Sequence, residues 1–264
     1  QKDVQQYISG CEKCTMRKNP NPKQRAPMQI AGSGTPMERI ATDILCELPE
    51  TDRGNRHILV VSDYFTKWTE AFALQSMDAE TVASTIMEQV IARFGVPSVL
   101  HSDQGRQYES KLFSEMCRLL GIRKTRNNPN HPKSDGMVER FNRTLLSMLS
   151  TYVQENQRDW DVYHPYLLMA YRSTAHETTN FSPNMLMLGR EATSPLDLIY
   201  MMPSDIKEIP SNQWIWISRE RLETAHKIVR EHTEKEMLHQ KKDHDAKVAW
   251  YFPVRKSCCS PKLT

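Results

Sequence analysis

The chain has 264 residues, of which 39% are hydrophobic and 25% are charged, and its formal net charge is only +3. This length and composition predict one packed domain with flanking pieces. No run of 18 apolar residues occurs, which excludes a membrane-spanning segment. The first residues, Gln1-Lys-Asp-Val-Gln-Gln, resemble neither a signal segment nor a natural start, so we expect a piece of a longer protein.

The charge is distributed unevenly along the chain. Residues 1–27 hold six Lys and Arg against two acids, and residues 219–264 hold eleven against seven, whereas residues 28–218 carry a net charge of −5. Basic ends around a slightly acidic centre fit a metal site flanked by arms that neutralise phosphates, or simply solvated tails. Among the six cysteines only Cys11 and Cys14 have ligand-like spacing, which favours a reducing compartment over a disulfide framework.

The predicted elements begin after a linker rich in Pro, Lys, Asn and Gly at 15–37. Strand patterns at 39–45, 57–63 and 67–74, joined by short turns, predict an antiparallel meander. The apolar period then lengthens to that of a helix, which Gly95 ends, and the apolar positions are Val82, Ile86, Val90 and Phe94.

The second half predicts further strands and helices in alternation. In chain order they are a strand at 98–101, a helix at 110–120, a strand at 122–126, an irregular loop at 127–134, a helix from about 135 and a helix at 160–171. Residues 219–247 predict a long polar helix or connector that acts as a spacer, and 248–254 predict one or two strands. The fold class is therefore α/β, with a five-stranded mixed sheet flanked by helices and a C-terminal helical extension.

Three acids stand out by their places in this pattern. Asp43 lies inside the first strand, Asp103 follows the fourth, and Glu139 lies on a helix with 35 residues between it and Asp103. Such a set can converge to hold divalent metal for phosphodiester chemistry. Spacing alone does not single them out, since the chain has 32 acidic residues. We interpret Asp63 as a turn cap rather than a fourth ligand, and His101 as a packed side chain rather than a proton relay.

The sequence motifs around these acids closely resemble those of retroviral-type integrases, most of all the integrases of Ty3/gypsy-class LTR retrotransposons. The matching words are Leu100-His-Ser-Asp-Gln-Gly105, Ser134-Asp-Gly-Met-Val-Glu-Arg-Phe-Asn142, Asp63-Tyr-Phe-Thr-Lys-Trp-Thr-Glu-Ala71, Arg93-Phe-Gly95, Ala170-Tyr-Arg172, Phe181-Ser-Pro183 and Leu188-Gly-Arg190.

The resemblance implies an RNase H-like core in which Asp43, Asp103 and Glu139 are catalytic and hold two Mg²⁺ (or Mn²⁺) ions. It implies trimming of a 3′ end of the element's DNA, followed by attack of the freed hydroxyl on target DNA. Converging carboxylates fit this role, because without a cation they repel one another.

The resemblance also implies DNA contacts near the triad. The residues that could serve are Lys124, Arg126, Asn130, Lys133, Arg140 and Arg143. Asn130 and Lys133 depart from the Tyr and Gln usual in the family, which removes a stacking ring and adds a charge. Cys46-Glu47 likewise replaces a more usual Gly-Pro.

The flanks resemble parts of two further integrase domains. Cys11 and Cys14 match half of a His-His-Cys-Cys zinc module, which would bind Zn²⁺ only if upstream histidines were supplied. We therefore expect four segments: a partial zinc module with linker (1–27), the catalytic core (28–195), a linker with a polar helix (196–247) and the start of a C-terminal barrel (248–264).

The leading hypothesis is an integrase that acts on double-stranded DNA, at the element's ends and the target, as a homo-multimer without membrane contact. The expected location is intracellular and nuclear at the point of action, after a virus-like particle or the cytoplasm. The alternatives are a decayed or domesticated copy that binds DNA or protein without catalysis, and a plain RNase H-like nuclease.

Overall fold

The computed structural model describes residues 34–46, 48–126, 136–153, 157–193 and 211–245. The linker before residue 34, the loop at 127–134 and the strand segment at 248–254 lie outside the described residues. Contacts divide the chain into two compact units, Ala31–Glu236 and a second made of Gln1–Ile30 with Met237–Thr264. The larger unit contains the sheet and the helices that pack on it.

A five-stranded mixed sheet forms the centre of the larger unit. Its strands are β1 (Arg39–Leu45), β2 (His57–Asp63), β3 (Thr69–Leu74), β4 (Val99–Ser102) and β5 (Arg123–Arg126). The strand order is β3-β2-β1-β4-β5, in which β1, β2 and β3 are antiparallel neighbours and β4 and β5 run parallel to β1. The predicted meander and mixed sheet are confirmed, and β1 is the central strand.

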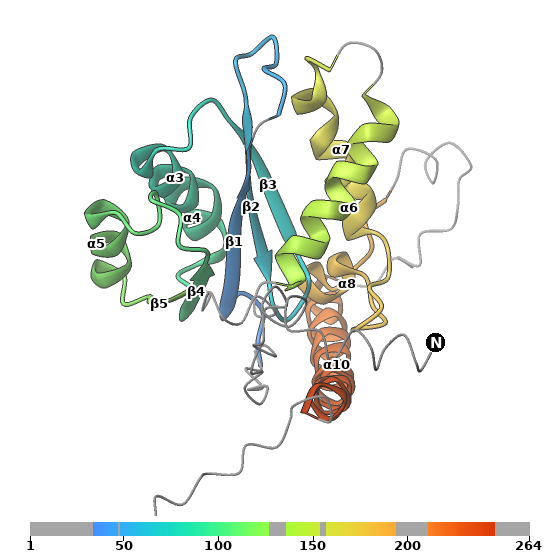
Figure 1. Cartoon of the computed structure of the whole chain (residues 1–264). Helices are drawn as coiled ribbons and strands as arrows, with labels where there is room; N and C mark the ends of the chain where they lie inside the picture. Colours follow the sequence, from blue (N-terminus) through green and yellow to red (C-terminus); the bar gives the residue numbers. More distant parts are fainter. Residues whose placement is uncertain (1–33, 47, 127–135, 154–156, 194–210, 246–264) are drawn as a thin grey trace, which may run out of the picture. The chain divides into compact units, whose positions relative to one another are not determined.

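One face of the sheet is covered by short helices (Figure 1). They are α3 (Ala79–Thr85), the π-helical η1 (Ile86–Ile91), α4 (Ala92–Phe94) and α5 (Lys111–Leu119). Ser110 is the N-cap of α5, and its hydroxyl accepts a hydrogen bond from the Phe113 backbone N–H. The sequence predicted one regular helix from the spacing of Val82 to Phe94. The structure inserts a π-helical turn there, and both Val90 and Ile91 are buried.

The other face is covered by α6 (Gly136–Tyr152) and α7 (Trp160–Arg172), as Figure 1 shows. The predicted apolar stripe of α6 packs on side chains of β1 and β2 such as Ala41 and Val60, and its buried members are Val138, Phe141, Leu145 and Leu149. Helix α6 is therefore fixed against the central strand, and this contact brings Glu139 toward Asp43.

A third apolar cluster joins α8 (Pro183–Leu188) to α10 (Ser211–Asp245). Ala225 and Val229 of α10 are buried with Phe65 and Leu186. The predicted long polar helix is confirmed, but it begins at Ser211 rather than near 219. The expectation that it acts as a spacer was wrong, because part of it packs on the core. Its many charged residues hid the two apolar positions, one turn apart, that make this contact.

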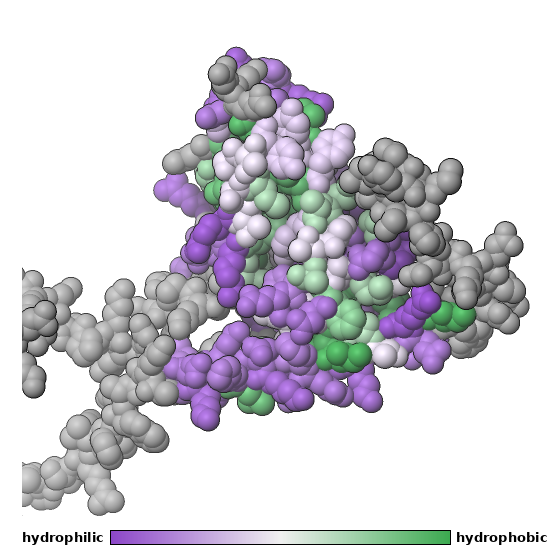
Figure 2. Space-filling model, turned by 90° about the vertical axis from the view of Figure 1, so that its right-hand side faces the viewer, coloured by the Kyte–Doolittle hydropathy of each residue, from purple (hydrophilic) through white to green (hydrophobic). Residues whose placement is uncertain are grey.

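Figure 2 shows the side of the molecule that carries α6, α7 and α10. The exposed surface of α10 is mainly hydrophilic, whereas hydrophobic patches lie among polar ones over α6 and α7. The exposed apolar side chains of these two helices include Leu146, Val162 and Met169. Within the described ranges, no helix is both long enough and apolar enough to cross a membrane.

Candidate active site at the sheet edge

Asp43 lies on the central strand, with its side chain on the face covered by α6. It is half-buried and stands opposite Val60 of β2, a member of the core beneath α6. One carboxylate oxygen, Oδ1, accepts a hydrogen bond of 2.9 Å from the Ile44 backbone N–H. Because β1 pairs with β2 on one side and β4 on the other, the backbone that carries this carboxylate is fixed from both sides.

Asp103 is brought beside Asp43 by the parallel pairing of β1 and β4. Thr42 pairs with Ser102, so each acid follows directly after the same row of the ladder. Neighbouring strands lie about 4.8 Å apart, so the two backbones are adjacent at this edge. The Asp103 carboxylate accepts a 2.9 Å hydrogen bond from the Gly105 N–H, which fixes the turn after β4.

Glu139 lies in the first turn of α6, and Asn142 shows how that turn faces the sheet. The Asn142 side-chain amide donates a 2.7 Å hydrogen bond to Oδ2 of Asp43. Residues three apart share a helix face, so Glu139 lies one turn before this contact on the same side. Its side chain is 64% exposed, and Oε1 is 3.5 Å from Nη2 of Arg143.

The acids are thus brought to one edge without forming a closed metal cage. Within the described residues, no group of three His, Cys, Asp or Glu side chains is placed to hold a metal ion. The donor set nevertheless fits a hard divalent cation, because all three acids offer carboxylate oxygens and Glu139 is exposed enough to reorient. The Asn142 side-chain oxygen is buried beside Asp43 without a hydrogen-bond partner, so a further oxygen is available there.

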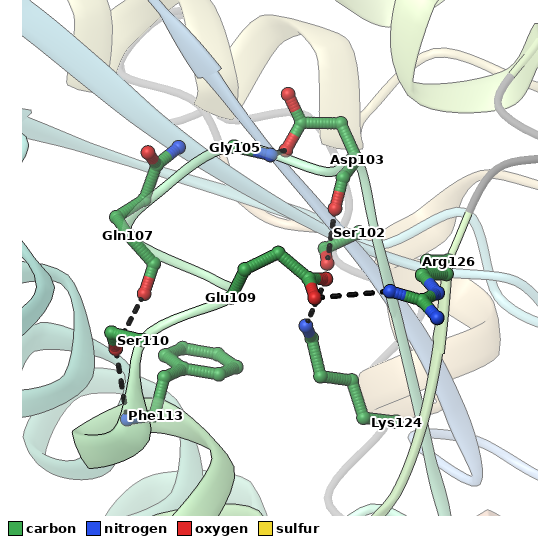
Figure 3. Close-up of polar contacts among 9 residues, drawn as sticks. All are labelled: Ser102, Asp103, Gly105, Gln107, Glu109, Ser110, Phe113, Lys124 and Arg126. Atoms are coloured by element: carbon green, nitrogen blue, oxygen red, sulfur yellow. Dashed lines mark hydrogen bonds and ion pairs between the residues drawn. The ribbon is translucent and has the colours of Figure 1, made fainter. Parts of the chain in front are cut away.

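The predicted DNA-contacting cations are placed in two groups. Arg140 and Arg143 are exposed on α6, one and four residues after Glu139. Lys124 and Arg126 lie on β5, and both form ion pairs with Glu109 (Figure 3). The remaining predicted contacts, Asn130 and Lys133, and the half-site Cys11 and Cys14 lie outside the described residues.

Sequence reasoning missed a further basic group near α6. Lys67, in the turn between β2 and β3, donates a 2.7 Å hydrogen bond to the Tyr64 carbonyl, and burial lowers its pKa to about 8. Burial, with the nearby charges of Lys67 and Arg140, lowers the pKa of His176 to about 4. Positive charge from Lys67 and Arg140 therefore gathers beside the start of α6, and no motif spacing signalled it because the two residues come from different segments.

Two side chains weighed as site residues have the structural roles that the sequence favoured. The Asp63 carboxylate accepts hydrogen bonds from the N–H groups of Phe65 and Thr66, as a turn cap does, and burial raises its pKa. His101 is buried, and its Nδ1 is 2.8 Å from the Thr125 hydroxyl.

Comparison with known proteins agrees with this arrangement. Residues 34–132 match the family described as "Integrase core domain". The Pol polyprotein of transposon 412 from Drosophila melanogaster is 27% identical over 219 residues, which cover 80% of this chain and 17% of the polyprotein. The Gag-Pol polyprotein of Walleye dermal sarcoma virus is 35% identical over 135 residues, or 51% of this chain and 8% of the polyprotein. The Tf2-3 polyprotein of Schizosaccharomyces pombe is 27% identical over 250 residues, or 94% of this chain and 18% of the polyprotein.

The chain therefore spans less than a fifth of the length of these polyproteins. Among solved structures, a chain of the simian T-cell lymphotropic virus intasome, in complex with PP2A regulatory subunit B56 gamma, has the same fold. Its TM-score is 0.55 at 24% identity, over 73% of this chain and 70% of that chain. The RNase H-like fold expected from the sequence is confirmed.

Proposed function

We propose that this chain, which carries an integrase core domain of the retroviral and Ty3/gypsy retrotransposon type, is a metal-dependent polynucleotidyl transferase. In this proposal it removes a short 3′ end from the element's DNA and joins the new end to target DNA. The observation that supports it best is the paired register of β1 and β4, which sets Asp43 and Asp103 side by side, with α6 hydrogen-bonded to Asp43.

Asp43, Asp103 and Glu139 are the residues that would hold Mg²⁺ or Mn²⁺, two ions per site. When bound, such ions lower the pKa of an attacking water or hydroxyl and stabilise charge on the phosphate oxygens. The chain's own part is to present the carboxylates in fixed directions. Asn142 orients Asp43, and the Gly105 N–H orients Asp103.

Double-stranded DNA is the proposed substrate and target. Arg140 and Arg143 follow Glu139 on the exposed surface of α6, where they are available to phosphate groups. Joining both ends of one element to a target requires two active sites, so we propose that the chain works as a homo-multimer. Its place of action would be the nucleus, where target DNA lies.

The experiment is resolution of a branched DNA that mimics the joined product, with Mg²⁺ or Mn²⁺ present. The wild type should resolve the branch, and Asp103→Asn should abolish this because it removes a metal-binding charge with little change of shape. Asp52→Asn is the matched control, since it makes the same change at an exposed acid of the β1–β2 loop.

Two results would point elsewhere. A folded protein that binds DNA but resolves no branch with either metal would favour a decayed or domesticated copy. Cleavage of RNA–DNA hybrids in preference to strand joining would favour a plain RNase H-like nuclease.

A further inference from the structure

Glu109 holds two of the predicted DNA-contacting cations in a forked ion pair. Its Oε1 is 2.8 Å from Nζ of Lys124, and its Oε2 is 3.1 Å from Nη1 of Arg126. Figure 3 shows the Glu109 carboxylate pointing at both cations, while the Asp103 carboxylate points elsewhere. In this arrangement both cations are paired with an anion that belongs to the chain itself.

This fork lies at the same edge of the sheet as the candidate active site, on the opposite face. Arg126 pairs with Ser102 in the parallel ladder of β4 and β5, directly before Asp103. The Lys124 ammonium is 5.9 Å from the ring centroid of Phe113, a core residue of α5. Asp43 and Asn142 lie on the α6 face, so the fork is beside the acids and distinct from them.

The two ion pairs of Glu109 differ in how easily another anion can replace the glutamate. The Lys124 side chain is 17% exposed and packs over Phe113, whereas the Arg126 side chain is 64% exposed. Exposed ion pairs are weak and screened by salt. A guanidinium binds a phosphate in the same way as it binds a carboxylate, so phosphate can replace Glu109 at Arg126.

The Glu109 carboxyl is ionised at neutral pH. Its hydrogen bond to Lys124, more than any other contact, holds the pKa of the Glu109 carboxyl below its usual range. The competing anion is therefore always present when DNA arrives.

We propose that Glu109 is a built-in competitor of DNA phosphate, which occupies Arg126 in the free protein and is displaced from it when DNA binds. The inference rests on the proposed function, because it takes DNA as the ligand. Its consequence is that Glu109 limits the affinity for DNA, while Lys124 keeps Glu109 close by.

The test is DNA binding by Glu109→Gln, measured as fluorescence anisotropy of a labelled duplex over a series of NaCl concentrations in EDTA. Loss of one exposed ion pair should tighten binding about two- to fivefold at low salt. Because Arg126 contacts phosphate in both the wild-type and the variant complex, the slope of log affinity against log salt should stay the same. In the double variant Glu109→Gln, Arg126→Gln, the gain in affinity should disappear and the slope should fall by about 0.9.

Glu115→Gln is the matched control. Glu115 is an exposed acid of α5 that pairs with Arg118, so its loss changes the net charge equally but frees a cation away from the β5 end. If Glu109→Gln binds no tighter than Glu115→Gln, the proposal is wrong and Glu109 only braces the turn before α5. If Glu109→Gln does not fold, Arg126→Gln alone decides: it should reduce the salt slope by about 0.9, and an unchanged slope overturns the proposal.

The experiments distinguish failure of the proposed function from failure of the competitor proposal. Wild type that binds no DNA would overturn both. Wild type that binds and resolves branched DNA, with Glu109→Gln matching the control, would overturn the competitor alone.

Discussion

Asn142 is the residue whose role changes most between sequence and structure. It is the last residue of the motif that contains Glu139, and nothing in the sequence pattern separates it from its neighbours. In the structure it is 6% exposed and donates to Asp43 across 99 positions of sequence. Its role depends on which face of α6 meets β1, and that contact is a property of the packed helix rather than of the motif.

We expect Asn142→Leu to weaken metal-dependent activity while preserving the fold. Leucine has nearly the same shape but cannot donate, so Asp43 would lose the hydrogen bond that orients it. Loss of such a supporting contact typically costs about 10- to 100-fold in metal affinity or activity. A titration of branch resolution against Mg²⁺ should show a higher half-saturating concentration, partly restored at high metal. An unchanged Mg²⁺ dependence would show that Asn142 does not position Asp43.

The half-buried side chain of His176 should make the free energy of unfolding depend on pH. Its pKa is about 4 in the folded chain and 6.5 ordinarily, so between these values the unfolded chain binds a proton that the folded chain does not. The free energy of unfolding should therefore fall as the pH drops from 6.5 toward 4. His176→Gln should flatten this fall in urea denaturation curves, and His239→Gln, at an exposed position of α10, should not. Identical pH profiles for wild type and His176→Gln would contradict the prediction.

At the scale of elements, a buried ion pair ties β3 to α7. The Arg172 guanidinium is 2.7 Å from the Glu70 carboxylate, donates to the Thr69 carbonyl and lies 4.3 Å from the ring centroid of Trp68. Burial lowers the pKa of Arg172, and Glu70 opposes this. The sequence predicted both the strand and the helix, and Arg172 lies in one of the motifs that resemble the integrase family. It could not show that the helix is joined to the strand by a charge pair, because the two residues are far apart along the chain.

We expect Arg172→Met to lower the free energy of unfolding by about 3–5 kcal/mol. Methionine can still pack on Trp68, but Glu70, whose side chain is 9% exposed, would lose its nearest cation and remain buried. Urea denaturation measures the loss. The comparison variant is Arg118→Met, which breaks an exposed pair and should cost less than about 1 kcal/mol. Equal losses for the two variants would mean that the Arg172 pair is not buried in solution.

At the scale of the whole molecule, the sequence predicted the order of strands and helices and the three acids, because each has a local signature. Turn residues mark the ends of the strands, apolar spacing defines the helices, and the acids lie in distinctive sequence motifs. It did not predict three contacts between distant segments: the amide of Asn142 on Asp43, the fork of Glu109 and the packing of α10. Each of these depends on strand register or on a helix face, which a single sequence does not encode locally.

The central claim is that Asp43, Asp103 and Glu139 form one metal site, although Glu139 faces Arg143 in the free protein. The most direct measurement is backbone cleavage by Fe²⁺ bound in place of Mg²⁺, with peroxide and ascorbate, followed by mapping of the cuts. The account predicts cuts near all three acids, which excess Mg²⁺ suppresses and Asp43→Asn abolishes together. Cuts near Asp43 and Asp103 without any near Glu139, or cuts that Mg²⁺ does not suppress, would contradict it.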